Sequence, residues 1–170
     1  YRSIGDHQFA LGHNGNLTNT RELAAEHGML PGTVASDSDL VAELICAELS
    51  NRLDEPTSTA LQAALTAVLP RLEGAFSFVL MDTERVYGVR DPSGLRPLCL
   101  GRSDGFWVVA SESPALDIVG ATMVREVEAG ELVVLDRDEP PRSLRPFPPE
   151  RIDPRLCLFE FVYFARPDAR

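Results

Sequence analysis

The sequence predicts an α+β layered sandwich, in which helices cover an antiparallel sheet. Residues 1–70 carry apolar side chains at helical spacing, whereas residues 74–136 change to short apolar strands. Gly, Pro, Asp and Ser separate these strands at roughly ten-residue intervals, which is typical of antiparallel neighbours. The strands are apolar nearly throughout rather than alternating, so we expect both faces of the sheet to be covered.

Three helices are predicted in the first half of the chain, after a strand and turn over residues 4–17. Each begins at a polar residue, as in Asn19-x-x-Glu22 and Ser36-x-x-Asp39, and ends near a Gly or Pro. Their expected ranges are 19–28, 36–55 and 59–70.

Five strands and one short helix are predicted in the second half. The strands are rich in Val, Leu and aromatic residues and are bounded by turn residues. We expect them over 74–82, 85–91, 97–102, 106–113 and 130–136, with a helix over 114–120.

A proline-rich segment marks the expected domain boundary. Residues 138–155 hold six prolines, which is typical of a stiff, extended connector. The first domain is therefore expected over 1–137, and the apolar run in 156–170 is predicted to begin a second domain whose remainder is absent. Because the chain opens with Tyr1 and ends on ARPDAR, we expect it to be a fragment of a longer protein.

The composition argues against several functions. The formal net charge of −10 repels phosphate backbones, so we expect no nucleic-acid partner. All the basic side chains counted in the sequence are Arg, and the absence of Lys excludes a P-loop lysine or a Schiff base. No apolar run approaches the roughly 20 residues of a membrane-spanning helix, so we expect no membrane partner.

The cysteines and histidines form no recognisable site. Cys46, Cys99 and Cys157 are far apart, and with no signal-peptide pattern this indicates a reducing, cytoplasmic compartment. Cys46 and Cys99 have apolar neighbours and are expected in the core. His7 and His27 are expected to be solvated, and neither a catalytic triad nor a metal-binding spacing is present.

Two motifs carry groups suited to acyl transfer. In HNGN, the Asn14 side-chain amide and the Gly15 N–H could stabilise an oxyanion, because Gly leaves the backbone open to a substrate. The alternative is a plain turn before a helix. In SDSD, Asp37 could hold a substrate ammonium group between the hydroxyls of Ser36 and Ser38, and the alternative is a helix cap.

A third motif, RDPSGLRPL, indicates a strand, a turn and a strand. We expect Arg90, Asp91 and Arg96 to form an ion-paired corner with a structural role. Together with GHNGNLTN, SDSD, GAFSFVLMD and VASES, this motif resembles the class II glutamine amidotransferase domain, and the resemblance covers essentially the whole chain. That family has an N-terminal-nucleophile (Ntn) hydrolase fold, a four-layer αββα sandwich, here expected to be incomplete at the N-terminus.

Within that family, the chain is most similar to the amidophosphoribosyltransferases. NLTN, SDSD, GLRPL and the tail CLFEFVYFARPD carry this similarity, and the tail resembles the junction into a phosphoribosyltransferase domain. The resemblance implies a glutaminase whose ammonia converts phosphoribosyl pyrophosphate to 5-phosphoribosylamine, the first committed step of purine synthesis. Glutamine and phosphoribosyl pyrophosphate are the implied substrates, and a homo-oligomer is expected at full length.

The resemblance also implies roles for single residues. Asn14 and Gly15 match the oxyanion-hole pair, and Asp37 matches the acid that binds the glutamine α-amino group. The family's nucleophile is an N-terminal cysteine, and Cys46, Cys99 and Cys157 do not occupy its place. The family's arginine clamp for the α-carboxylate lies in a segment expected upstream of Tyr1, and Arg2 stands outside the motif. We therefore expect this chain alone to be inactive.

The cofactors are implied in the same way. Mg²⁺ would belong to the phosphoribosyltransferase domain, and no cofactor is expected in this chain alone. Some family members hold a [4Fe–4S] cluster with one ligand just before the FVYFARPD-like run, where Cys157 stands. Since a cluster needs four thiolates, Cys157 is either one ligand, with the others further downstream, or a packed core cysteine.

Two other interpretations remain open. The first is another class II amidotransferase, of the glucosamine-6-phosphate synthase or glutamate synthase type, which would carry a different downstream domain. The second is a non-catalytic glutaminase-like domain, which would also lack the nucleophile.

Overall fold

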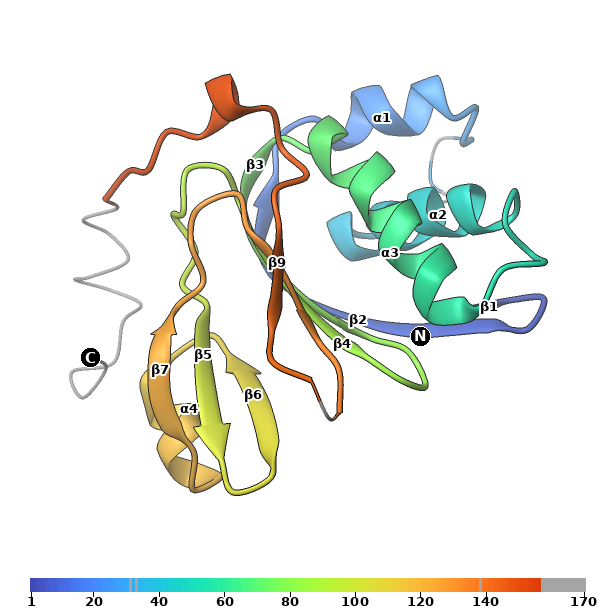
Figure 1. Ribbon diagram of the computed structural model, residues 1–170. Coiled ribbons are helices and arrows are strands. Elements are labelled where there is room, and N and C mark those ends of the chain that lie inside the picture. The colour runs from blue at the N-terminus through green and yellow to red at the C-terminus, as the bar shows by residue number, and fades with distance from the viewer. Residues whose placement is uncertain (31, 33, 138, 157–170) are drawn as a thin grey trace.

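Two antiparallel sheets face each other in the computed structural model, which describes residues 1–156 except positions 31, 33 and 138 (Figure 1). The larger sheet has six strands in the order β1-β2-β3-β4-β8-β9, and the smaller has three in the order β6-β5-β7. The larger sheet contains β1 (Arg2–Ile4), β2 (His7–Leu17), β3 (Gly74–Met81), β4 (Val86–Arg90), β8 (Leu132–Leu135) and β9 (Arg142–Leu144). The smaller sheet contains β5 (Cys99–Ser103), β6 (Phe106–Ala110) and β7 (Thr122–Glu126).

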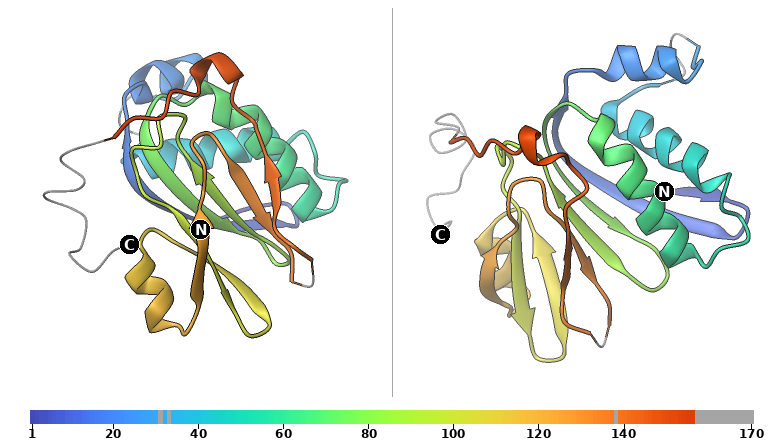
Figure 2. Two further views of the ribbon diagram at one scale, coloured as in Figure 1. Left: turned by 60° about the vertical axis from the view of Figure 1, so that its left-hand side comes forward. Right: turned by 45° about the horizontal axis from the view of Figure 1, so that its top comes forward.

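Helices cover the outer faces of both sheets (Figures 1 and 2). Three of them, α1 (Thr20–Glu26), α2 (Asp37–Leu49) and α3 (Thr57–Val68), lie on the side of the larger sheet, and α4 (Ser113–Ile118) lies on the smaller sheet. The 3-10 turns are η1 (Leu69–Arg71) and η2 (Pro149–Arg151). The layer order is therefore αββα, which confirms the predicted α+β sandwich.

Three apolar clusters fill the spaces between the layers. The largest lies between the helices and the larger sheet and includes Leu61 and Phe78, both 0% exposed. A second joins the two sheets through Leu100 and Val133, and a third packs beneath α4 around Leu116. Because the larger sheet is covered on both faces, its central strands are apolar throughout, as the sequence pattern indicated.

The HNGN motif lies in a strand, so the predicted turn is wrong. Residues 10–17 of β2 pair continuously with β3, from Ala10 opposite Met81 to Leu17 opposite Gly74. Gly15 has a φ of 139°, a conformation that other residues rarely adopt. The Asn-Gly pair that signals a turn serves instead to bring two strand backbones into close approach.

Three strands, β1, β7 and β9, were not predicted as separate strands. β7 exposes every second residue, Thr122, Val124 and Glu126, so it has no apolar run. β9 lies inside the proline-rich segment, pairs with β8, and is followed by Phe147, which is buried in the main core. Part of the expected connector, 138–155, therefore packs on the domain, while its role in joining two domains stays a prediction.

Two polar residues have more contacts than predicted. His7 was expected in solvent but is 2% exposed, and its Nδ1 lies 3.1 Å from Thr57 Oγ1. Asn19 was expected to cap α1, yet its side chain makes no capping bond. Its Nδ2 donates to the Arg71 carbonyl and its Oδ1 accepts from the Glu73 N–H, which ties the start of α1 to the turn before β3.

A buried carboxylate links the two sheets. Glu131, next to β8, is 0% exposed and accepts two hydrogen bonds from Arg125 of β7, at 2.7 and 2.8 Å. The Ser143 hydroxyl of β9 and the Glu128 N–H also donate to it. Burial by itself raises the pKa of Glu131, but the bonds from Arg125 and Ser143 outweigh burial and hold it below 4.5.

This lowered pKa predicts that acid destabilises the fold through Glu131. The unfolded chain takes up the proton more readily than the folded protein, so the stabilisation is complete above the unfolded value of 4.5 and is lost as the pH falls through the folded value. Glu131→Gln should lower the free energy of unfolding by about 2 kcal/mol at neutral pH and make it depend less on pH in acid. Urea unfolding between about pH 3 and pH 7 checks this. The exposed Glu150→Gln is the matched control, and an equal deficit for Glu131→Gln at every pH would contradict the prediction.

Candidate functional site

The first candidate group is the backbone N–H of Gly15. Gly15 lies opposite Phe76 of β3. The N–H and carbonyl groups of Phe76 both bond Asp91, on the side of β3 that faces away from β2. The Phe76 N–H donates to Asp91 Oδ2 at 3.3 Å, and the Phe76 carbonyl accepts from the Asp91 N–H at 2.9 Å. In an antiparallel pair of strands, a residue whose N–H and carbonyl point to the far side forms no backbone hydrogen bond with the residue opposite. The Gly15 N–H therefore points away from β3, toward an edge that β1 covers only at residues 7–9.

The second candidate group is the side-chain amide of Asn14, the preceding residue on β2. Its Oδ1 accepts a hydrogen bond from Nη2 of Arg96. A guanidinium can only donate, so the amide oxygen must face Arg96 and the amide nitrogen must face away. Within the described residues no acceptor binds this nitrogen. Adjacent residues thus present two N–H donors on β2, and their role as an oxyanion hole stays a prediction.

Asp37 stands at the first position of α2, beside the end of β2. Its Oδ2 accepts from the Leu17 N–H at 2.7 Å. Ser36, not Asp37, caps the helix, since the Ser36 hydroxyl accepts from the Asp39 N–H. The alternative interpretation of Asp37 as the cap is therefore wrong. Asp37 also lines a cavity of about 510 Å³ between α1 and the segment before α2, and among the described residues only one of its carboxylate oxygens accepts a hydrogen bond.

His13 links the two motifs, a role that the sequence did not indicate. Its Nδ1 lies 3.4 Å from the Ser38 hydroxyl on α2, and its ring packs edge-on against Phe78 at 4.8 Å. Burial lowers the pKa of His13, the charge of Arg96 lowers it further, and Asp37 opposes both. His13 therefore sits between HNGN and SDSD and holds β2 against the N-terminus of α2.

A buried carboxylate bonded to backbone N–H groups holds the RDPSGLRPL corner, rather than the expected ion pairs of Asp91 with Arg90 and Arg96. Asp91 is 0% exposed, and its carboxylate accepts from the N–H groups of Ser93, Leu95 and Arg96 as well as Phe76. Burial raises the pKa of Asp91, and these N–H donors oppose the rise. The carboxylate therefore organises the backbone of the corner.

The two arginines of this corner point to other partners. Arg90 bonds Glu126 at 2.8 Å and the Gly94 carbonyl at 2.9 Å, and its Nε donates to the Arg96 carbonyl at 3.0 Å. Arg96 reaches Asn14, which is 82 positions away in the sequence. Sequence reasoning missed this contact because no local pattern relates the two residues.

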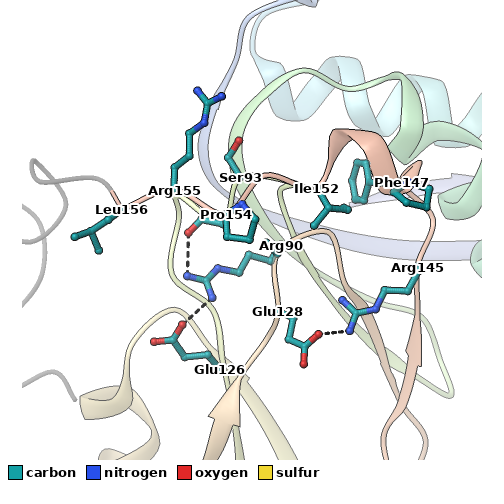
Figure 3. Close-up of a pocket in the computed structure, with 13 residues that line it drawn as sticks. Arg90, Ser93, Glu126, Glu128, Arg145, Phe147, Ile152, Pro154, Arg155 and Leu156 are labelled. Atoms are coloured by element: carbon teal, nitrogen blue, oxygen red, sulfur yellow. Dashed lines mark hydrogen bonds and ion pairs between the residues drawn. The ribbon is translucent and has the colours of Figure 1, made fainter.

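The corner also borders a larger cavity, of about 760 Å³, at the end of the described chain (Figure 3). Figure 3 shows Arg90 bonded to Glu126 and Arg145 bonded to Glu128 on its wall. The corner and the FVYFARPD tail are our candidates for a contact between domains. The tail lies outside the described residues, so this contact stays a prediction.

The described cysteines are poor nucleophiles. Burial raises the pKa of the Cys46 thiol, and it raises that of Cys99 to about 11. The Cys99 thiol also donates to the Ala110 carbonyl at 3.2 Å. A reactive cysteine needs a lowered pKa, so neither residue fits that role, and Cys157 lies outside the described residues.

Neither a metal-binding cluster nor a membrane-spanning helix is present in the described part of the chain. Within residues 1–156, apart from the three omitted positions, no group of three or more His, Cys, Asp or Glu side chains is placed to hold a metal ion. In that same part, none of the helices has the length and apolar character needed to cross a membrane.

A family model and several known proteins match this chain. The family model described as a glutamine amidotransferase domain matches residues 2–118. The chain belongs to this family. The glutamine amidotransferase domain therefore includes Asn14, Gly15, Asp37 and the corner around Asp91.

Individual relatives of this glutamine amidotransferase domain are amidophosphoribosyltransferases, as the motifs predicted. The chain is 47% identical to that of Mycobacterium leprae, covering 94% of this chain and 28% of the relative, and 38% identical to that of Bacillus subtilis, covering 99% and 34%. The solved glutamine phosphoribosylpyrophosphate amidotransferase of B. subtilis, complexed with ADP and GMP, matches with a TM-score of 0.82 at 37% identity, over 100% of this chain and 35% of that one. The chain thus spans about a third of the length of these relatives.

Proposed function

We propose that this chain is the glutaminase part of an amidophosphoribosyltransferase. The observation that carries the proposal is the pair of adjacent open donors on β2, the Asn14 amide nitrogen and the Gly15 N–H, beside the Asp37 carboxylate. Relatives with that name cover almost the whole chain, which supports the assignment.

The three residues would act together on glutamine. A cysteine thiolate, supplied by a segment outside this chain, attacks the side-chain amide carbon and forms a tetrahedral intermediate. The Asn14 amide and the Gly15 N–H donate to the oxygen as its negative charge develops. Ammonia leaves with a proton from the cysteine's own amino group, and water then hydrolyses the thioester to glutamate. Asp37 holds the α-ammonium group of the substrate throughout.

In the complete enzyme the ammonia would react at a second site. It would displace pyrophosphate from phosphoribosyl pyrophosphate and give 5-phosphoribosylamine, with Mg²⁺ held by the phosphoribosyltransferase domain. A cytoplasmic homo-oligomer is the expected form. Cys157 would serve there as an iron–sulfur ligand or as a core residue.

The coding sequence on both sides of this segment provides the first test. A Cys-led strand upstream and a phosphoribosyltransferase downstream should be found, and the encoded protein should form phosphoribosylamine from glutamine or ammonia. A sugar isomerase domain downstream would favour the glucosamine-6-phosphate synthase type. A start codon directly before Tyr1 would favour the non-catalytic domain instead.

Asp37→Asn in the full-length enzyme tests the substrate contact. The variant keeps an oxygen for the Leu17 N–H but loses the charge that binds the α-ammonium group. We expect the KM for glutamine to rise about 10- to 100-fold, the scale of one charge-assisted hydrogen bond. Synthesis from ammonia should be unchanged.

Asp39→Asn is the matched control for that experiment. Asp39 lies in the same helical turn but pairs with Arg2 in a solvent-accessible salt bridge of small energetic value. Its KM for glutamine should stay near wild type. If Asp37→Asn also abolished synthesis from ammonia, its effect would be on folding, and the proposed substrate contact would lose its support.

A further inference from the structure

Arg96 contacts the side-chain amide of Asn14 and can fix its orientation. Its Nη2 donates to Asn14 Oδ1. Resting on the proposed function, we infer that Arg96 is a positioning residue for glutamine hydrolysis: it holds the Asn14 amide so that its N–H groups face the developing oxyanion. Arg96 itself need not touch the substrate.

The chemistry of the two side chains makes this contact directional. An Asn side chain can rotate its oxygen and nitrogen into each other's place at little cost, and only one arrangement donates toward the substrate. A guanidinium carries donors only, so it binds the oxygen and rejects the reversed amide. A neutral or apolar residue at position 96 would leave both arrangements populated.

The backbone of Arg96 is itself held by two neighbouring residues of the corner. Its backbone N–H donates to Asp91 at 3.3 Å, and its carbonyl accepts from Arg90 at 3.0 Å. Asp91 in turn is bonded to both backbone groups of Phe76, the residue opposite Gly15. The corner thus anchors Arg96, which orients the Asn14 amide. It also bonds Phe76, so that the Gly15 N–H opposite has no backbone partner on β3.

Two other asparagines near Asn14 have amide nitrogens that are already bonded to the protein. Asn16 donates its Nδ2 to the Leu17 carbonyl, and Asn19 donates its Nδ2 to the Arg71 carbonyl. Both amide nitrogens are occupied by the protein. Asn14 differs because its oxygen is the bound atom, which keeps its nitrogen available for a ligand. Preorganised donors of this kind stabilise a transition state without reorganising during the reaction.

A double-mutant cycle in the full-length enzyme tests the inference. Arg96→Met should lower kcat for glutamine hydrolysis about 10- to 100-fold, the scale of a misplaced catalytic group, with little change in KM. Arg96→Lys, which keeps a donor, should recover part of the loss. In an Asn14→Ala background, where no amide remains to orient, Arg96→Met should cost nothing more. Synthesis from ammonia should be unchanged in every variant.

The outcomes separate this inference from the proposed function. If Asn14→Ala itself leaves glutamine hydrolysis unchanged, the proposed oxyanion hole fails. If Asn14→Ala lowers the hydrolysis rate but Arg96→Met does not, only the positioning role fails. The positioning role also fails if Arg96→Met lowers the rate by the same factor in the wild-type and Asn14→Ala backgrounds. Should Arg96→Met not fold, Arg96→Lys carries the same cycle, with equal losses in both backgrounds as the overturning result. Arg102→Lys, which alters an arginine stacked on Trp107, should behave as wild type.

Discussion

Asn14→Asp in the full-length enzyme should lower the turnover of glutamine hydrolysis by roughly 10²- to 10³-fold, the scale of one lost oxyanion donor. The change replaces the amide proposed to donate to the oxyanion by a carboxylate that would repel it. It should not unfold the protein, because a carboxylate oxygen can still accept the hydrogen bond from Arg96, now with opposite charges. Steady-state release of glutamate from glutamine measures the effect.

Two comparisons make this result specific. Asn16→Asp changes the same residue type two positions along β2, on an exposed side chain bonded only to the neighbouring Leu17 carbonyl. It should leave turnover near wild type. Synthesis from ammonia should survive in both variants, because that reaction bypasses the glutaminase. Unchanged turnover in Asn14→Asp would remove Asn14 from the oxyanion hole.

The sequence predicted helices and strands correctly where burial requires apolar residues at regular spacing or in a continuous run. The helix α2 was predicted because its apolar residues recur at helical spacing and pack on the larger sheet, and Ser36 caps it as expected. The strands β3, β4 and β8 were predicted because both faces of their sheet are covered. By contrast, β7 exposes alternate residues and β9 lies among prolines, so neither has an apolar run.

The candidate site was predictable only in part. Asn14, Gly15 and Asp37 belong to short contiguous motifs, so the sequence could single them out as candidates. The geometry around them was not, because the Asn-Gly pair is a local turn signal that pairing with β3 overrides. The contact between Arg96 and Asn14 joins a corner to a distant strand, and only the folded chain brings such residues together.

The close approach of two strands at Gly15 leads to the last prediction. Gly15→Ala should destabilise the domain by about 4 kcal/mol, about half from backbone strain at positive φ and half from overpacking. A Cβ at Gly15 would lie 2.1 Å from the Ala75 carbonyl oxygen and 2.7 Å from the Phe76 Cα. Both are backbone atoms, so no side-chain rotation relieves the clash and β2 must move away from β3. Calorimetric unfolding should show a melting temperature lower by about 10 °C.

Gly28→Ala separates the two causes. Gly28 also has a positive φ, of 64°, but a Cβ there would meet nothing within 4 Å. It should cost only the strain, about 1 to 2 kcal/mol. The extra loss in Gly15→Ala then measures the clash with β3, and equal losses in the two variants would show that β2 and β3 do not approach so closely. Because the displaced backbone carries the Gly15 N–H, the full-length Gly15→Ala enzyme should also lose glutamine hydrolysis at temperatures where it is still folded. The Gly15 position therefore couples the packing of β2 on β3 to the placement of the proposed donor.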